Sequence, residues 1–108
     1  MDIIKSVPYR HVVLFQFKAS ATPDVVKIIE AAFRDLCSKL EFVKGFVWEI
    51  NSSPEPLNNG FTHCFIVTFD DPAGRDSYLP HPLHQEFCET YLEPNVEQLC
   101  VVDFLSQR

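Results

Sequence analysis

The sequence predicts a single α+β domain whose elements follow the order β-α-β-β-α-β. Three observations support this order. Apolar side chains alternate in strand-length segments at residues 9–18, 46–51, 61–69 and 99–105. Helical stripes with start signals occupy residues 22–40 and 71–92, and a segment rich in proline and asparagine separates the middle strands at 52–60. The order is that of a ferredoxin-like fold, a four-stranded antiparallel sheet with helices on one side.

The composition fits one soluble globular domain. With 108 residues, of which 46% are hydrophobic, the chain can bury a sizeable core. The net charge is −6 and no segment gathers lysine and arginine, which argues against nucleic acid as a partner. No basic and apolar leader begins the sequence, and no apolar run approaches the roughly 20 residues of a membrane helix. We therefore expect a cytoplasmic protein without a membrane partner.

The cysteines are scattered along the chain. None forms a C-x-x-C pair or the close spacing of a zinc site. We interpret them as buried free thiols, and disulfides of a secreted protein are the alternative. The four are Cys37, Cys64, Cys88 and Cys100.

The first strand and helix have the clearest patterns. Residues 9–18 place His11 and Phe15 on one face and Val12 and Leu14 on the other, so both faces are largely apolar, as in a central strand. The segment 22–24 supplies a capping hydroxyl, a proline for the first helical position and an acid for the first turn. An amphipathic stripe follows at Val25, Ile29, Ala32, Phe33, Leu36 and Leu40.

The second half repeats the pattern with a broken helix. The third strand places aromatic and apolar side chains on one face, with His63 among them. A helix begins after Asp71 and is broken by Pro80 and Pro82, and a helical stripe resumes through 83–92. We expect a turn at 93–95 and a last strand at 99–105.

The sheet has a second apolar face that its own helices cannot cover. A large exposed apolar face is rare on a soluble monomer. We therefore expect two copies to place their sheets face to face across a two-fold axis, forming a homodimeric α/β barrel. A ligand or a partner protein covering that face is the alternative.

Histidines and a tyrosine are the candidate chemical groups. His11 and His63 lie on apolar strand faces and would line one cavity if they point the same way; the alternative is two neutral core histidines. Prolines on both sides of His81 stiffen the segment between Tyr78 and His84. A histidine base and a tyrosine donor suit proton abstraction beside a carbonyl group. A histidine capping a carbonyl and a tyrosine filling an interface would explain the same residues without a substrate.

Two further features are weaker. His81 and His84 are three residues apart, but Pro82 lies between them and no third ligand is near, so we expect no metal site. Asp103, in the apolar last strand, is either a partner for a histidine or a solvent-facing residue.

Four segments together resemble the stress-responsive A/B barrel family, also called the dimeric α/β barrel family. They are residues 9–15, 60–63 and 101–104, and the segment Tyr78-Leu79-Pro80-His81-Pro82-Leu83-His84. The resemblance covers residues 9–105 and leaves 1–8 as an N-terminal extension. It implies a ferredoxin-like fold, an obligate homodimer that in some members assembles further, and a hydrophobic pocket between sheet and helices.

The resemblance also implies two kinds of function. Some plant members are stress-induced proteins without an assigned reaction, whereas similar polyketide cyclases use a tyrosine and histidine pair for a cofactor-free aldol cyclisation. That pair falls on Tyr78 and His84, with His11 and His63 as further pocket residues. A cyclase tyrosine on the first helix falls on Phe33, a departure that counts against cyclisation specifically. We also expect Phe65, His81 and Phe87 at the pocket.

Two hypotheses follow. In one, the protein binds a small apolar or aromatic carbonyl compound and cyclises or isomerises it without a cofactor, with His84 as base and Tyr78 stabilising the enolate. In the other, it is a non-catalytic, stress-protective or ligand-carrying dimer whose histidines are structural. The fold alone does not choose between them.

Overall fold

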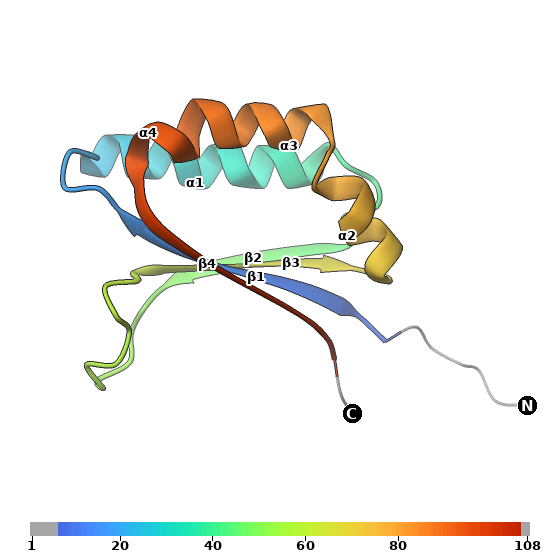
Figure 1. Ribbon diagram of the computed structural model, residues 1–108, viewed down its shortest axis with the longest axis horizontal. Coiled ribbons are helices and arrows are strands. Elements are labelled where there is room, and N and C mark those ends of the chain that lie inside the picture. The colour runs from blue at the N-terminus through green and yellow to red at the C-terminus, as the bar shows by residue number, and fades with distance from the viewer. Residues whose placement is uncertain (1–6, 107–108) are drawn as a thin grey trace, which may run out of the picture.

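A computed structural model describes residues 7–106 and confirms the ferredoxin-like fold. One antiparallel sheet has the strand order β2-β3-β1-β4. Figure 1 shows α1 and α3 side by side over one face of this sheet, while the opposite face carries no helix from the described part of the chain. The elements are β1 (Tyr9–Phe17), α1 (Pro23–Ser38), β2 (Gly45–Ile50), β3 (His63–Phe69), α2 (Pro72–Tyr78), α3 (Pro82–Phe87), the π-helical turn η1 (Cys88–Leu92), α4 (Glu93–Asn95) and β4 (Val96–Leu105). Most of the predicted N-terminal extension, residues 1–6, lies outside the described residues.

Strand β1 is central, as its two apolar faces predict. It pairs with β3 on one side and with β4 on the other. His11 therefore lies between Val67 and Asp103, and Phe15 lies between His63 and Leu99. Side chains paired across neighbouring strands share a face, so these residues all lie on the helix side of the sheet.

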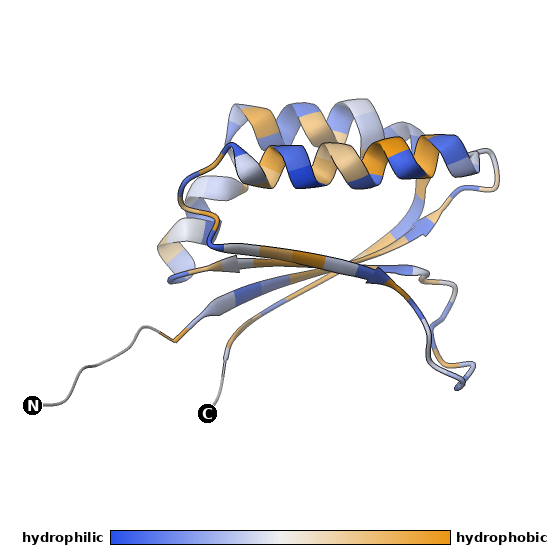
Figure 2. Ribbon diagram, turned by 180° about the vertical axis from the view of Figure 1, so that it is seen from behind, coloured by the Kyte–Doolittle hydropathy of each residue, from blue (hydrophilic) through white to orange (hydrophobic). Residues whose placement is uncertain are grey.

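Helix α1 begins where its capping signals predict. The Thr22 hydroxyl accepts a hydrogen bond from the Val25 N–H (3.2 Å), and Pro23 occupies the first turn. Apolar and polar residues alternate along the ribbon of α1 in Figure 2, as expected for a helix with one buried face. The helix ends at Ser38, so Leu40 of the predicted stripe is buried in the following turn.

The second helical region is split, as the prolines predict. The Asp71 carboxylate caps α2 by accepting from the Gly74 N–H (3.1 Å), and the His81 Nδ1 caps α3 by accepting from the Leu83 N–H (3.1 Å). Pro80 and Pro82 have no N–H to donate, and one backbone hydrogen bond, from the His81 N–H to the Tyr78 carbonyl oxygen (3.1 Å), spans the break. Residues 93–95, predicted as a turn, instead form the last helical turn, α4.

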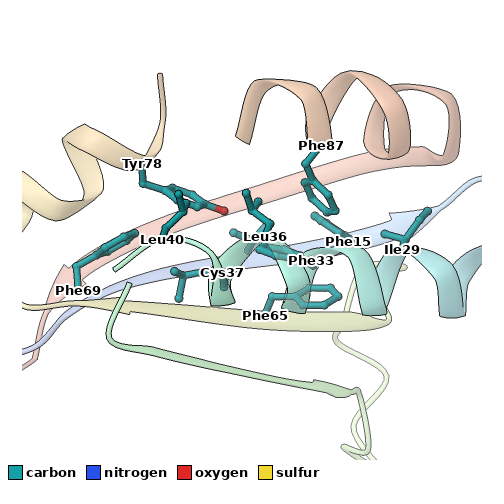
Figure 3. Close-up of a cluster of buried hydrophobic side chains, with 12 residues drawn as sticks. Phe15, Ile29, Phe33, Leu36, Cys37, Leu40, Phe65, Phe69, Tyr78 and Phe87 are labelled. Atoms are coloured by element: carbon teal, nitrogen blue, oxygen red, sulfur yellow. The ribbon is translucent and has the colours of Figure 1, made fainter. Parts of the chain in front are cut away.

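The core between sheet and helices is aromatic. The Phe33 ring lies 4.7 Å from Phe65, 4.9 Å from Phe87 and 6.2 Å from Phe15, measured between ring centroids. Figure 3 shows these side chains from β1, β3, α1 and α3 converging in one cluster. Such contacts stabilise the sandwich through both burial and ring geometry.

The cysteines are free thiols, but only one is buried. Cys37 belongs to the core, and burial raises the pKa of its thiol to about 12. Cys64, Cys88 and Cys100 are half-buried, so the prediction of four buried thiols is wrong for these three.

The sheet face opposite the helices is apolar and exposed in the single chain. Val47, Val102 and Phe104 on this face are 62%, 54% and 45% exposed. The loop between β2 and β3 covers one end, where Leu57 and Phe61 help to enclose a hollow of about 320 Å³. We call the part of this face that the loop leaves uncovered, around Val47, Val102 and Phe104, the open face. Among residues 7–106, no helix is long and apolar enough to cross a membrane.

Candidate functional site

A cavity of about 200 Å³ lies between the β1–β4 half of the sheet and the helices. Most of its wall is apolar, which favours an apolar ligand. Its polar lining comes from five side chains: His11, Tyr78, His84, Cys88 and Asp103. We call it the His84 cavity. The rest of its lining is Val13, Phe15, Phe33, Leu79, Phe87, Leu92, Leu99 and Val101.

Tyr78 is one of the residues that line this cavity. The residue ends α2 and is fully buried, with its ring centroid 4.4 Å from His84, 5.4 Å from Phe69 and 5.7 Å from His11. Burial raises the pKa of Tyr78 far above its ordinary value, so the hydroxyl stays protonated and can donate a hydrogen bond.

His84 is held as a base. Its Nδ1 lies 2.9 Å from the Leu79 carbonyl oxygen, which can only accept, so Nδ1 carries the proton. In the neutral ring the lone pair is then on Nε2. Burial lowers the pKa of His84 below 6.5, which favours this neutral form at physiological pH. Nε2 can therefore accept a proton from a group in the cavity.

His11 is tied to a carboxylate. Its Nδ1 lies 2.7 Å from Asp103 Oδ1, while Asp103 Oδ2 accepts from the Arg75 guanidinium at 2.7 Å. Arg75 also donates to the Tyr9 hydroxyl (2.8 Å). Asp103 is thus the partner of a histidine, which was one of its two predicted roles. The carboxylate holds the His11 ring in a fixed orientation.

His63 lies elsewhere, so the prediction that it shares a cavity with His11 is wrong. Its Nε2 lies 2.9 Å from Glu30 Oε2 and its Nδ1 lies 2.9 Å from the Thr62 hydroxyl. His63 pairs with Phe15 of β1, and Phe15 is four residues along β1 from His11. His63 and His11 are therefore separated by roughly 13 Å along the strand direction. Both histidines point to the helix side, but His63 is a hydrogen-bonded core residue.

Two more predicted pocket residues do not line the His84 cavity. Phe65 lies beneath Phe33 and is fully buried in the core. His81 caps α3 with its Nδ1 and lies outside the cavity lining. The structure thus brings together five of the eight predicted site residues, namely His11, Phe33, Tyr78, His84 and Phe87.

The sequence analysis missed Cys88. Its Sγ lies 3.5 Å from His84 Nε2 and lines the same cavity. The spacing of four residues along a helix is the sequence signal that could have paired them. Within residues 7–106, no group of three or more histidine, cysteine or acidic side chains is arranged to hold a metal ion.

Comparison with known proteins identifies the family. The Stress responsive A/B Barrel Domain pattern matches residues 9–106. The chain belongs to this family. Protein HS1 of Arabidopsis thaliana, a stress-response A/B barrel domain-containing protein, is 31% identical over 97 residues, 90% of this chain and 88% of HS1. Olivetolic acid cyclase of Cannabis sativa is 22% identical over 99 residues, 92% of this chain and 97% of the cyclase.

Solved A/B barrel and ferredoxin-like structures share the fold. At3g17210 from Arabidopsis thaliana superposes with a TM-score of 0.88 at 29% identity, covering 93% of this chain and 96% of its own. Hydroxynitrile lyase from Passiflora edulis has a TM-score of 0.87 at 23% identity, covering 95% and 96%. A dimeric ferredoxin-like protein from Thermobifida fusca has a TM-score of 0.79 at 20% identity, covering 96% and 95%.

Proposed function

We propose that this A/B barrel protein binds a small apolar or aromatic carbonyl compound in the His84 cavity and removes a proton from the carbon next to the carbonyl group. One observation carries the proposal. His84, with its lone pair on Nε2, and Tyr78, with its protonated hydroxyl, line the same apolar cavity. A base and a hydrogen-bond donor in one apolar cavity are what enolisation requires.

The reaction needs only these two groups. As His84 Nε2 takes the α-proton, negative charge develops on the carbonyl oxygen, and the Tyr78 hydroxyl donates a hydrogen bond to it. Return of the proton at another carbon isomerises the substrate. Attack of the enolate on a second carbonyl group of the same molecule cyclises it. No cofactor takes part in either route.

The apolar wall supplies the binding energy. Phe15, Phe33 and Phe87 line the cavity and are already buried, so they offer an apolar environment in which each large apolar group of the ligand that leaves water contributes about 2 kcal/mol. Similar proteins include a cyclase and a hydroxynitrile lyase, which supports carbonyl chemistry for this fold. Because Phe33 stands where the cyclase resemblance places a tyrosine, we propose enolisation as the common step and leave its outcome to the substrate.

We further infer that two copies pair through the open face and form a barrel. Val47, Val102 and Phe104 are exposed there, and burying them against a second copy removes an apolar surface from water. The similar Thermobifida fusca protein is described as dimeric. The His84 cavity lies on the opposite side of the sheet, so pairing leaves both cavities in place.

A specific contact favours a second candidate, a non-catalytic ligand carrier. His84 Nδ1 and Gln85 Nε2 both donate to the Leu79 carbonyl oxygen, at 2.9 Å and 3.0 Å. These bonds satisfy a backbone carbonyl at the helix break, so His84 has structural work without any reaction. In that case the cavity holds a carbonyl compound unchanged.

Hydrogen–deuterium exchange on a carbonyl probe separates the two. Acetophenone, an aromatic ketone with α-protons, is incubated with the protein in D₂O, and α-deuteration is followed by NMR. Enolisation predicts catalysed exchange that falls about a hundredfold in His84→Gln, because Gln cannot act as a base. His81→Asn is the matched control, since His81 lies outside the cavity lining and asparagine can keep the cap on the Leu83 N–H, and it should keep the exchange rate. Acetophenone that binds without catalysed exchange in the native protein would establish the carrier instead.

A further inference from the structure

Cys88 and His84 form a second reactive pair in the His84 cavity. The distance from Cys88 Sγ to His84 Nε2 is 3.5 Å, within reach of a sulfur hydrogen bond. Because His84 keeps its proton on Nδ1 for the Leu79 carbonyl, Nε2 can only accept. The Cys88 S–H is therefore the donor. A thiol that donates to a histidine held by another hydrogen bond is the arrangement of an activated nucleophile.

A neighbouring residue can hold a carbonyl group beside this pair. Tyr78 is fully buried, and its ring centroid lies 4.4 Å from that of His84. Tyr78 lines the same cavity as Cys88, and Figure 3 shows its hydroxyl pointing from the ring toward the Leu36 and Phe87 side of the core. Burial raises the pKa of Tyr78, so the hydroxyl stays protonated and can donate a hydrogen bond to a ligand oxygen.

We propose that Cys88 is a covalent addition site for small α,β-unsaturated carbonyl compounds. The Cys88 sulfur forms a bond to the β-carbon of the ligand, and the carbon–carbon double bond opens. The S–H proton moves to His84 Nε2, while the electron pair shifts onto the carbonyl oxygen, where Tyr78 stabilises the enolate. His84 then returns the proton to the α-carbon. The products are a saturated thioether on Cys88 and a neutral His84, so atoms and charge balance.

The surroundings require the histidine to take the proton during the addition. Burial, with smaller contributions from Glu93 and Glu89, raises the pKa of the Cys88 thiol, so few molecules carry a free thiolate at neutral pH. Burial keeps His84 neutral over the same range. The titratable groups facing the pair from the other elements are His11 of β1, Tyr78 of α2, His81 before α3 and Asp103 of β4.

This inference goes beyond the proposed function, because it leaves the ligand attached to the protein instead of turning it over. It rests on the proposed function in one respect, the entry of small carbonyl compounds into the cavity. Cys64 and Cys100 lie on the far side of the sheet from His84, so a histidine-dependent adduct belongs to Cys88.

The test uses cyclohex-2-enone as the probe. The native protein, His84→Gln and Cys88→Ser are incubated with it, and the adduct is located by mass spectrometry of peptides. We expect the adduct at Cys88 in the native protein, none in Cys88→Ser at that position, and a rate about a hundredfold lower in His84→Gln. A Cys88 adduct that forms as fast in His84→Gln, or no adduct at Cys88 at all, overturns the proposal.

The pH dependence tests the same step without any variant. From pH 7 to pH 8 the Cys88 rate should stay nearly constant, because neutral His84 and the intact thiol are both already present. A reaction through free thiolate would instead rise nearly tenfold, as N-acetylcysteine does in the same solution. Such a rise at Cys88 overturns the proposal. Acetophenone exchange reports separately on the proposed function: exchange without an adduct refutes only the covalent site, and an adduct without exchange refutes only catalysed enolisation.

Discussion

Replacing Tyr78 by phenylalanine should change stability little and activity strongly. The ring is fully buried and packs against the rings of Phe69 and His84, and a Phe ring can keep these contacts. No fully buried side-chain nitrogen or oxygen of residues 7–106 lacks a hydrogen-bond partner, so removing the Tyr78 hydroxyl relieves no unsatisfied group. The free energy of unfolding should therefore fall by no more than about 1.5 kcal/mol, the contribution of one ordinary hydrogen bond.

Catalysis should fall strongly. Loss of one donor to a developing oxyanion lowers rates by about 10²–10³, equivalent to about 2.7–4 kcal/mol. Urea denaturation measures the first effect and acetophenone exchange the second. Tyr91→Phe is the matched control, because Tyr91 packs against Phe87 (5.6 Å) outside the cavity lining, and it should leave exchange unchanged. A Tyr78→Phe protein that loses stability and keeps its exchange rate would refute the assigned role of the hydroxyl.

Three other changes have expected outcomes. Phe33→Ala should lower the free energy of unfolding, measured in urea, by about 3–5 kcal/mol, because it empties the centre of the aromatic cluster. Leu57 is 71% exposed, so Leu57→Ala should change the free energy of unfolding by less than about 0.5 kcal/mol. Equal losses for the two variants would contradict this packing. Because burial lowers the pKa of His84 below 6.5, acetophenone exchange should persist below pH 6.5. The free energy of unfolding should decrease as the pH falls below 6.5, because the unfolded state takes up the proton first. His84→Gln should lack both pH dependences, and exchange that is lost already above pH 6.5 would contradict the lowered pKa. Val102→Asp should lower the mass measured by light scattering from that of two chains to that of one, because pairing would bury the charge. A native protein with the mass of one chain would exclude pairing through the open face.

Local patterns were sufficient for most of the fold. Alternation over two apolar faces identifies β1 as a central strand, and Thr22 with Pro23 gives the start of α1. The predicted ends of the strands were wrong where polar residues extend a strand or where a turn shortens it. β4 begins at Val96 because Gln98 pairs with Gln16 of β1, a polar pair without an apolar signal.

The other boundary error has a backbone cause. β3 begins at His63 instead of Phe61, since Asn59 and Gly60 adopt positive φ angles of 52° and 84° and complete a turn that holds Phe61. Asparagine and glycine are the residues that adopt this conformation most readily. The sequence shows such a turn but not its last residue.

The site was less predictable than the fold. Tyr78 and His84 were found because prolines fix the segment between them, and His11 because it interrupts an apolar strand face. The separation of His63 from His11 depends on the strand register, and the pairing of His63 with Glu30 joins residues far apart in sequence. A single sequence does not specify such contacts, since they arise only when the sheet and helix are assembled.

The most direct measurement is a crystal structure of the protein with acetophenone bound. The expected complex has the ketone in the His84 cavity, its oxygen within hydrogen-bond distance of the Tyr78 hydroxyl and its methyl carbon about 3–3.5 Å from His84 Nε2. A ketone bound elsewhere, or held with its carbonyl group turned away from Tyr78 and its methyl carbon out of reach of His84, would contradict the proposed chemistry.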